Sequence, residues 1–156
     1  MGCVISGVMI TPLKKIFHPK GEVLHALKSG ENSFCGFGEA YFSCVDHGQK
    51  KGWKKHLRMT LNLVVPVGSI RFALYDARED SPTYLKKMQV TCSREQYRRL
   101  TIPPGIWVAF EGLGNENMLL NVANMQHDPE ESINISEAEL FGENGFADEA
   151  GEIWVE

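Results

Sequence analysis

The sequence lacks the features of a membrane, disulfide-bonded or classical metal-binding protein. Its four cysteines, Cys3, Cys35, Cys44 and Cys92, show no C-x-x-C spacing, and no signal peptide precedes them. We therefore expect reduced thiols in a cytoplasmic protein. No apolar run approaches the roughly 18 residues that cross a membrane, so no membrane partner is expected. The five histidines are scattered, without the spacing of metal ligands.

Strong positive charge is also missing overall, although one stretch is basic. The 156 residues carry a net charge of -4, which argues against nucleic-acid binding through a basic surface. Against this acidic background, Lys50 to Arg58 holds five lysines or arginines and one histidine. Such a local positive site suits a small anionic ligand better than a polymer. The length and composition fit one domain, residues 1–156.

Short alternating segments separated by glycine and proline predict an all-β sandwich or barrel. The clearest is Ser69 to Asp76, with Ile70, Phe72 and Leu74 on one face. Further strands are expected at 39–45, 84–90, 106–111 and 118–123.

The two ends of the chain are less regular. Residues 1–16 alternate weakly and are predicted to form short edge strands, candidates for exchange between subunits. Residues 128–156 are predicted to form an acidic C-terminal extension that is irregular or briefly helical, with Ser136 capping a turn at 136–141. Trp154 is expected to dock on the barrel or on a partner subunit.

The basic stretch lies in a frame of glycines that resembles the first cupin motif, G-x5-H-x-H-x4-E-x6-G. Here the frame reads Gly48-x5-Lys54-x-His56-x4-Leu61-x6-Gly68, so two of its three ligand positions hold a lysine and a leucine. These side chains cannot replace imidazole and carboxylate around a divalent ion.

The second cupin motif shows the same loss. Pro103-Pro104-Gly105 occupies its P-x-G turn, and Val108 stands where a histidine is expected. Only His56 remains of four ligand positions. The resemblance therefore implies a cupin-type jelly-roll barrel with no metal and no other cofactor.

More locally, the chain resembles the metal-free cupins that contain dTDP-4-dehydrorhamnose 3,5-epimerase and related nucleotide-sugar enzymes. The matching pieces keep their order over about two thirds of the chain: Lys51 to Trp53, Val67-Gly68, Tyr75 to Arg78, Ser81 to Thr83, Ile102 to Gly105 and His127 to Glu130. The resemblance implies a jelly-roll fold, a homodimer and a nucleotide-linked sugar as ligand, in bacterial surface polysaccharide biosynthesis.

The catalytic positions of that family are altered here. Its R-G-L-H-x-Q motif aligns with residues 51–56, so Lys54 takes the position of the base and His56 that of the glutamine. The family's tyrosine acid precedes the D-P-E segment, where this chain has Met125, Gln126 and His127. The resemblance thus supports the fold and ligand class more strongly than 3,5-epimerisation itself.

Three residues are candidates for catalysis. Removal of a proton next to a carbonyl needs a base, an acid on the opposite ring face and a cation near the enolate. His56 is the candidate base and Lys54 the enolate stabiliser or, if burial lowers its pKa, the base itself. His127 is a candidate proton donor. The alternatives are a ligand or inter-strand hydrogen bond for His56 and a turn hydrogen bond for His127.

Six residues are candidates for substrate binding. Lys51, Arg58 and Arg71 could neutralise a diphosphate, and Trp53, Tyr75 and Trp107 could stack on a base or sugar. The alternatives are a solvated strand edge for the cations and core packing for the aromatic residues.

The sequence supports three functions. The first is epimerisation or isomerisation of a nucleotide-linked 4-keto-6-deoxy sugar through an enolate. The second is a catalytically inactive cupin that binds a sugar or nucleotide sugar, which the leucine, valine and lysine at former functional positions favour. The third is an assembly partner for such a pathway, which the acidic C-terminal segment would suit.

Overall fold

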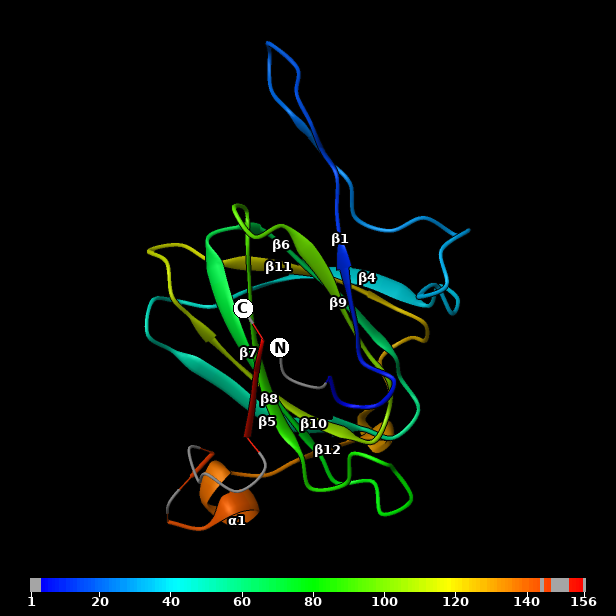
Figure 1. Cartoon of the computed structure of the whole chain (residues 1–156), viewed down its shortest axis with the longest axis vertical. Helices are drawn as coiled ribbons and strands as arrows, with labels where there is room; N and C mark the ends of the chain where they lie inside the picture. The colour runs from blue at the N-terminus through cyan, green and yellow to red at the C-terminus, as the bar shows by residue number, and fades with distance from the viewer. Residues whose placement is uncertain (1–3, 144, 147–151, 156) are drawn as a thin grey trace.

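The protein is a sandwich of two antiparallel-rich sheets, seen here in a computed structural model that describes residues 4–143, 145–146 and the backbone of 152–155. The first sheet has the order β1-β9-β6-β11-β4, and the second sheet the order β12-β5-β10-β7-β8-β13. A separate pair, β2-β3, forms a hairpin that extends away from both sheets (Figure 1). The predicted all-β jelly-roll class is confirmed.

The bounds of the elements follow the chain in order. They are β1 Met9–Pro12, β2 Lys15–Ile16, β3 Val23–Leu24, β4 Glu39–Cys44, β5 Lys50–His56, β6 Leu61–Val67, β7 Ser69–Asp76, β8 Lys87–Ser93, β9 Arg98–Ile102, β10 Ile106–Gly112, β11 Met118–Ala123, η1 Pro129–Glu131, β12 Ser132–Asn134, α1 Glu137–Phe141 and β13 Glu152–Val155. Among the described residues, no helix has the length and apolar character needed to cross a bilayer.

The core lies between the sheets and follows the alternation read from the sequence. Ile70, Phe72 and Leu74 of β7 are fully buried and pack with Leu100 and Ile102 of β9. Alternate residues of each strand point to one face of the pleat, so one strand contributes to the core with every second side chain. The predicted shared face of Ile70, Phe72 and Leu74 is therefore confirmed, and it is the face that β7 buries.

The strand predicted at 84–90 is displaced to 87–93, where it pairs antiparallel with β7. The cause is the preceding turn. Tyr84 N–H donates to the Ser81 carbonyl, Lys86 N–H donates to the Thr83 carbonyl, and Leu85 has a φ of 67°, so the chain is still turning there.

Buried Asp76 holds this turn together. Its carboxylate accepts hydrogen bonds from Arg78, Ser81 and Thr83. Burial opposes ionisation, but these hydrogen bonds outweigh it and lower the pKa of Asp76 to about 2. Arg78 also donates to the carbonyl of Ser6, which ties the N-terminal segment to the turn.

The chain ends add strands at the sheet edges. β1 pairs with β9, and β13 runs parallel to β8. The Trp154 side chain and residues 1–3 lie outside the described residues, so exchange of strands between subunits stays a prediction. Ser136 caps α1 as expected, accepting a hydrogen bond from Glu139 N–H at 3.1 Å.

Candidate active site

A cavity of about 390 Å³ opens between the two sheets. That volume lies within the roughly 300–1,000 Å³ typical of small-molecule sites. One wall is the first sheet and the other is the second. The lining residues are Tyr41, Ser43, Leu61, Leu63, Leu119 and Asn121 on the first sheet, and Lys51, Gly52, Lys54, His56, Val108, Phe110 and Asn134 on the second.

Strand β5 supplies the cationic side chains of this cavity. Lys51, Lys54 and His56 all line it. Strict alternation would place residues 51 and 54 on opposite faces of the sheet. A β-bulge between them shifts the alternation by one residue. Lys54 is paired with Val108 and Gly52 with Ala109, so Trp53 is an extra residue without a partner on β10. The bulge turns Trp53 outward and brings all three side chains to one face.

Gly52 makes the bulge possible. Its φ is 119°, and a Cβ there would lie 2.7 Å from the Cα of Ala109. No larger residue could bring β5 this close to β10 without displacing it. Trp53, the extra residue, is held in place on the side away from β10, where its backbone exchanges hydrogen bonds of 3.2 and 3.1 Å with Ile135.

His56 is paired with Glu131, a residue that the sequence analysis did not single out. Glu131 ends η1 and is 2% exposed, and its Oε1 contacts His56 Nδ1. Its Oε2 accepts from the backbone N–H groups of Arg58 and Met59 at 3.2 and 3.1 Å. Burial raises the pKa of Glu131, but the hydrogen bonds from His56 and these two N–H groups outweigh burial and leave it below its ordinary value.

This pairing sets the tautomer of His56. Because the Glu131 carboxylate can only accept, Nδ1 must carry the proton and donate it. In the neutral ring, Nε2 then keeps its lone pair and is free to act as a base. The carboxylate also stabilises the imidazolium that forms when Nε2 takes a proton, an arrangement known from catalytic histidines.

Lys54 and Lys51 differ in how their ammonium groups are engaged. Among the described residues, the side chain of Lys54 has no hydrogen bond or ion pair, so its charge is available to a ligand in the cavity. Lys51 Nζ donates to the Cys44 carbonyl at 2.6 Å and to Ser43 Oγ at 3.3 Å, which links β5 to β4.

Leu61 and Val108, which occupy ligand positions of the cupin frame, also line the cavity. They give its walls apolar surface at these points. Within the described ranges, no group of three His, Cys, Asp or Glu residues is arranged to hold a metal ion.

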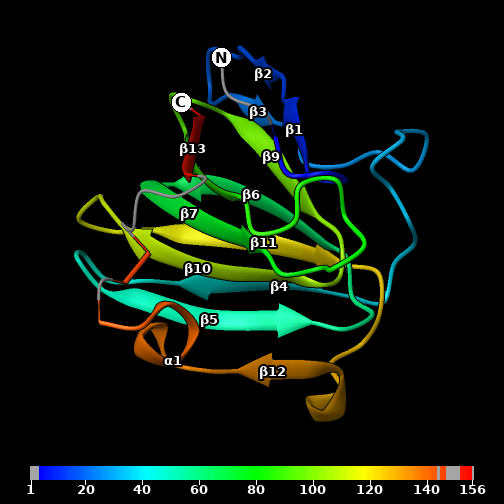
Figure 2. The same cartoon turned by 60° about the horizontal axis from the view of Figure 1, so that its bottom comes forward.

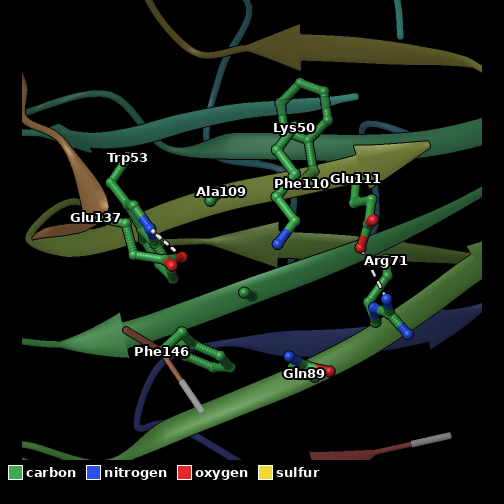
Figure 3. Close-up of a pocket in the computed structure, with 10 residues that line it drawn as sticks. Lys50, Trp53, Arg71, Gln89, Ala109, Phe110, Glu111, Glu137 and Phe146 are labelled. Atoms are coloured by element: carbon green, nitrogen blue, oxygen red, sulfur yellow. Dashed lines mark hydrogen bonds and ion pairs between the residues drawn. The ribbon is translucent and has the colours of Figure 1, made fainter. Parts of the chain in front are cut away.

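Four of the predicted site residues lie on the other face of the second sheet. Trp53, Trp107 and Phe146 form a cluster with half-buried Tyr75 and Phe141, which we call the outer aromatic cluster. Trp53 Nε1 donates to Glu137 of α1 at 3.2 Å. Arg71 lies near it, paired with Glu111 at 2.7 Å (Figure 3). The structure does not bring these residues to the cavity.

The outer face has a hollow of its own, but a small one. It encloses about 110 Å³ and is lined in part by Lys50, Trp53, Arg71, Gln89 and Glu137 (Figure 3). A nucleotide sugar is far larger than this volume allows. Ligand contacts by Trp53, Arg71, Tyr75 and Trp107 stay predictions, and packing is the role that the geometry gives the three aromatic residues.

Arg58 and His127 also lie away from the cavity. Arg58 follows β5, and its exposed guanidinium pairs with Asp128 at 3.0 Å, at the start of η1. His127 is exposed and is not among the residues that line the cavity between the sheets. Their predicted roles, phosphate contact and proton donation, have no support from this arrangement and stay predictions.

The fold and cavity define a class of protein: a jelly-roll cupin whose barrel holds a histidine–carboxylate pair and lysines where related barrels hold metal ligands. The comparisons give the family. The family model described as dTDP-4-dehydrorhamnose 3,5-epimerase matches residues 47–141. The chain belongs to this family.

Individual relatives agree with the family. A dTDP sugar isomerase from Desulfovibrio desulfuricans G20 is 36% identical, with a TM-score of 0.86, and the match covers 92% of this chain and 93% of that one. A "probable low-salt glycan biosynthesis epimerase" of Haloferax volcanii is 30% identical over 59% of this chain and 60% of its own length. The spore coat polysaccharide biosynthesis protein SpsL of Bacillus subtilis is 26% identical over 82% of this chain and 85% of its own.

Proposed function

We propose that the protein epimerises or isomerises a dTDP-linked 4-keto-6-deoxy hexose through an enolate, in the biosynthesis of a surface polysaccharide. The observation that carries this proposal is that one cavity is lined by His56, which is paired with Glu131, and by Lys54, whose side chain has no ion pair among the described residues. Membership of the dTDP-4-dehydrorhamnose 3,5-epimerase family supports the ligand class.

The reaction begins with His56 as base. Nε2 removes the proton from the ring carbon next to the ketone, and Glu131 stabilises the imidazolium. The electron pair of the broken C–H bond forms the enolate, whose oxygen bears the negative charge. The Lys54 ammonium, which lines the same wall, stabilises that charge. The enolate-stabilising cation, Lys54, and the base, His56, thus stand two residues apart on one strand.

A catalytically inactive binding protein is the second candidate. The observation that favours it is the apolar surface that Leu61 and Val108 give the cavity wall, at positions where the cupin frame has metal ligands. The His56–Glu131 pair would then serve to bind a sugar hydroxyl or ketone rather than to move a proton.

Deuterium exchange separates the two candidates. The protein is incubated with a dTDP-linked 4-keto-6-deoxy hexose in deuterated water, and the ring protons are followed by NMR. We expect loss of the signal next to the ketone, at a rate that falls by about 100-fold or more in His56→Asn. Binding of the nucleotide sugar without exchange by the wild type would contradict catalysis and support the binding protein.

We further propose a cytoplasmic homodimer. The described cysteines Cys35, Cys44 and Cys92 are all free thiols, as is usual in a reducing compartment. Phe17, Phe37 and Phe42 are 82%, 66% and 64% exposed, and we propose them as apolar side chains that a second subunit would cover. Light scattering at micromolar concentration should give twice the 17.5 kDa chain mass. A monomer at that concentration would contradict this.

A further inference from the structure

Inversion at the carbon next to the ketone needs a proton donor on the ring face opposite the base. His56 and Lys54 both come from β5, so the donor should come from the facing wall of the cavity. Two lining residues there carry a hydroxyl group, Tyr41 and Ser43 of β4. A phenol is a much stronger acid than an aliphatic alcohol, and Ser43 Oγ is already engaged with Lys51 at 3.3 Å. Tyr41 is therefore the better donor.

The hydroxyl of Tyr41 is held by Asn121. The two residues are direct partners across β4 and β11, and Asn121 Nδ2 lies 3.1 Å from the Tyr41 oxygen. Asn121 is 1% exposed, so its amide cannot exchange partners with water.

The orientation of the Asn121 amide decides which group donates. Its Oδ1 accepts from the backbone N–H of Asn62 at 3.2 Å, so the oxygen of the amide must face β6. Nδ2 must then face Tyr41, and it can only donate. The Tyr41 oxygen is consequently an acceptor in this contact, and its own proton is left free to point elsewhere.

Asn62 in turn is fixed. Its Nδ2 donates to the Ser33 carbonyl at 3.1 Å, and its Oδ1 accepts from the hydroxyl of Thr101. Asn62 and Thr101 are each 2% exposed. The amide of Asn121 is therefore supported by a buried polar network that reaches from β9 to β4, and a preorganised donor of this kind stabilises an anion effectively.

We propose that Tyr41 is the catalytic proton donor and that Asn121 is the positioning residue that stabilises its phenolate. This inference rests on the proposed function. The C–H bond breaks toward His56 Nε2 and the enolate forms. The Tyr41 O–H bond then breaks, and its proton bonds to the same carbon from the opposite face. The phenolate accepts the Asn121 N–H until it takes a proton from water, and the His56 imidazolium returns its proton to water.

The test compares exchange with inversion in Tyr41→Phe. With the dTDP-linked 4-keto-6-deoxy hexose in deuterated water, His56 can still remove a proton and return deuterium to the same face. We therefore expect exchange to fall by less than about 5-fold, while the epimerised product falls by about 100-fold. Tyr84→Phe, on an exposed turn outside the cavity, is the matched control and should change neither rate. Thermal melting of both variants checks that they are folded.

Each other outcome is decisive. The role of Tyr41 would be overturned if Tyr41→Phe formed the epimerised product within about 2-fold of the wild-type rate. It would also be overturned if a folded Tyr41→Phe lost exchange and inversion equally. Wild-type protein that exchanges deuterium but forms no epimerised product would also overturn the role of Tyr41. It would leave the proposed function in place. A wild type that neither exchanges nor inverts would overturn the proposed function and this inference together.

Discussion

The two faces of strand β5 carry residues of similar type with opposite roles. On the inner face, Lys54 and His56 line a cavity of about 390 Å³. On the outer face, Lys55 lies 5.0 Å above the ring of Trp107, and Trp53 packs against Phe141 and Phe146. Figure 2 shows the position of β5 between β12 and the rest of the second sheet, with α1 beside it. A basic run is therefore not one site, because the pleat divides its side chains between two faces of the sheet.

The largest effect is a loss of stability, expected from a substitution on the outer face of the second sheet. Trp107 is 6% exposed and belongs to the outer aromatic cluster. Trp107→Ala should lower the free energy of unfolding by about 3 kcal/mol, because it leaves a cavity that its neighbours cannot fill. Urea denaturation measures this loss. The exchange rate per folded molecule should be unchanged, whereas a tenfold loss of nucleotide-sugar affinity would show that Trp107 stacks on the ligand and would break the comparison.

Two neighbouring lysines test whether the face of β5 decides the role of a side chain. Lys54→Met should reduce deuterium exchange by about 100-fold, since it removes the cation nearest the developing enolate. Lys55→Met should leave exchange within about 2-fold and cost about 1 kcal/mol of stability, since its cation–π contact with Trp107 is partly buried. NMR exchange rates and urea denaturation measure the two effects. Equal losses of exchange in both variants would mean that the face of the strand does not matter.

Glu131→Gln should have a smaller effect with a characteristic pH dependence. Exchange should fall about tenfold, because His56 loses the carboxylate that fixes its tautomer and stabilises its charge. The folded pKa of Glu131 is depressed, so its contribution to stability is present above its unfolded pKa of roughly 4.3 and is lost as pH falls through the lower folded value.

Denaturation of wild type and Glu131→Gln across the pH range checks the sign. The difference in the free energy of unfolding should be largest above about pH 5 and should shrink below about pH 4. A difference that grows toward acid pH would contradict an ionised Glu131 in the folded protein.

The smallest effect is expected for a substitution of Arg58, which follows β5 and lies on neither of its two faces. The side chain of Arg58 is 64% exposed and pairs with Asp128 at the surface. Arg58→Met should change stability by less than about 1 kcal/mol and exchange by less than about 2-fold. Isothermal titration with dTDP supplies the check: a tenfold loss of affinity would show that the phosphates reach Arg58.

Part of this fold was predictable, because strands such as β7 and β11 alternate between buried and partly exposed residues with a period of two. The alternation of residues 69–76 predicted β7 and the residues that share each of its faces, and the bounds of β11 were also predicted. The strand after the turn was misplaced by three residues, since the network around Asp76 keeps residues 84–86 in a turn that their side chains do not reveal.

The site was predictable only within β5. Lys54 and His56 are two residues apart, the spacing that puts side chains of a strand on one face, and both line the cavity. The outward turn of Trp53 depends on a bulge, and one extra residue in a strand leaves no periodic signal. Glu131 and Tyr41 come from distant segments, and only the pairing of strands brings Glu131 to His56 and Tyr41 to the cavity. A sequence signal for Glu131 was its place directly after the D-P-E segment, in the turn that leads back to β5.

A crystal structure of His56→Asn with a dTDP-linked 4-keto-6-deoxy hexose tests the central claim most directly. The account predicts the hexose between the two sheets, with its ketone oxygen within hydrogen-bond distance of Lys54 Nζ and the adjacent carbon facing the substituted residue 56. A hexose bound on the outer face, against Trp107 or Arg71, with the cavity between the sheets left without sugar, would contradict it.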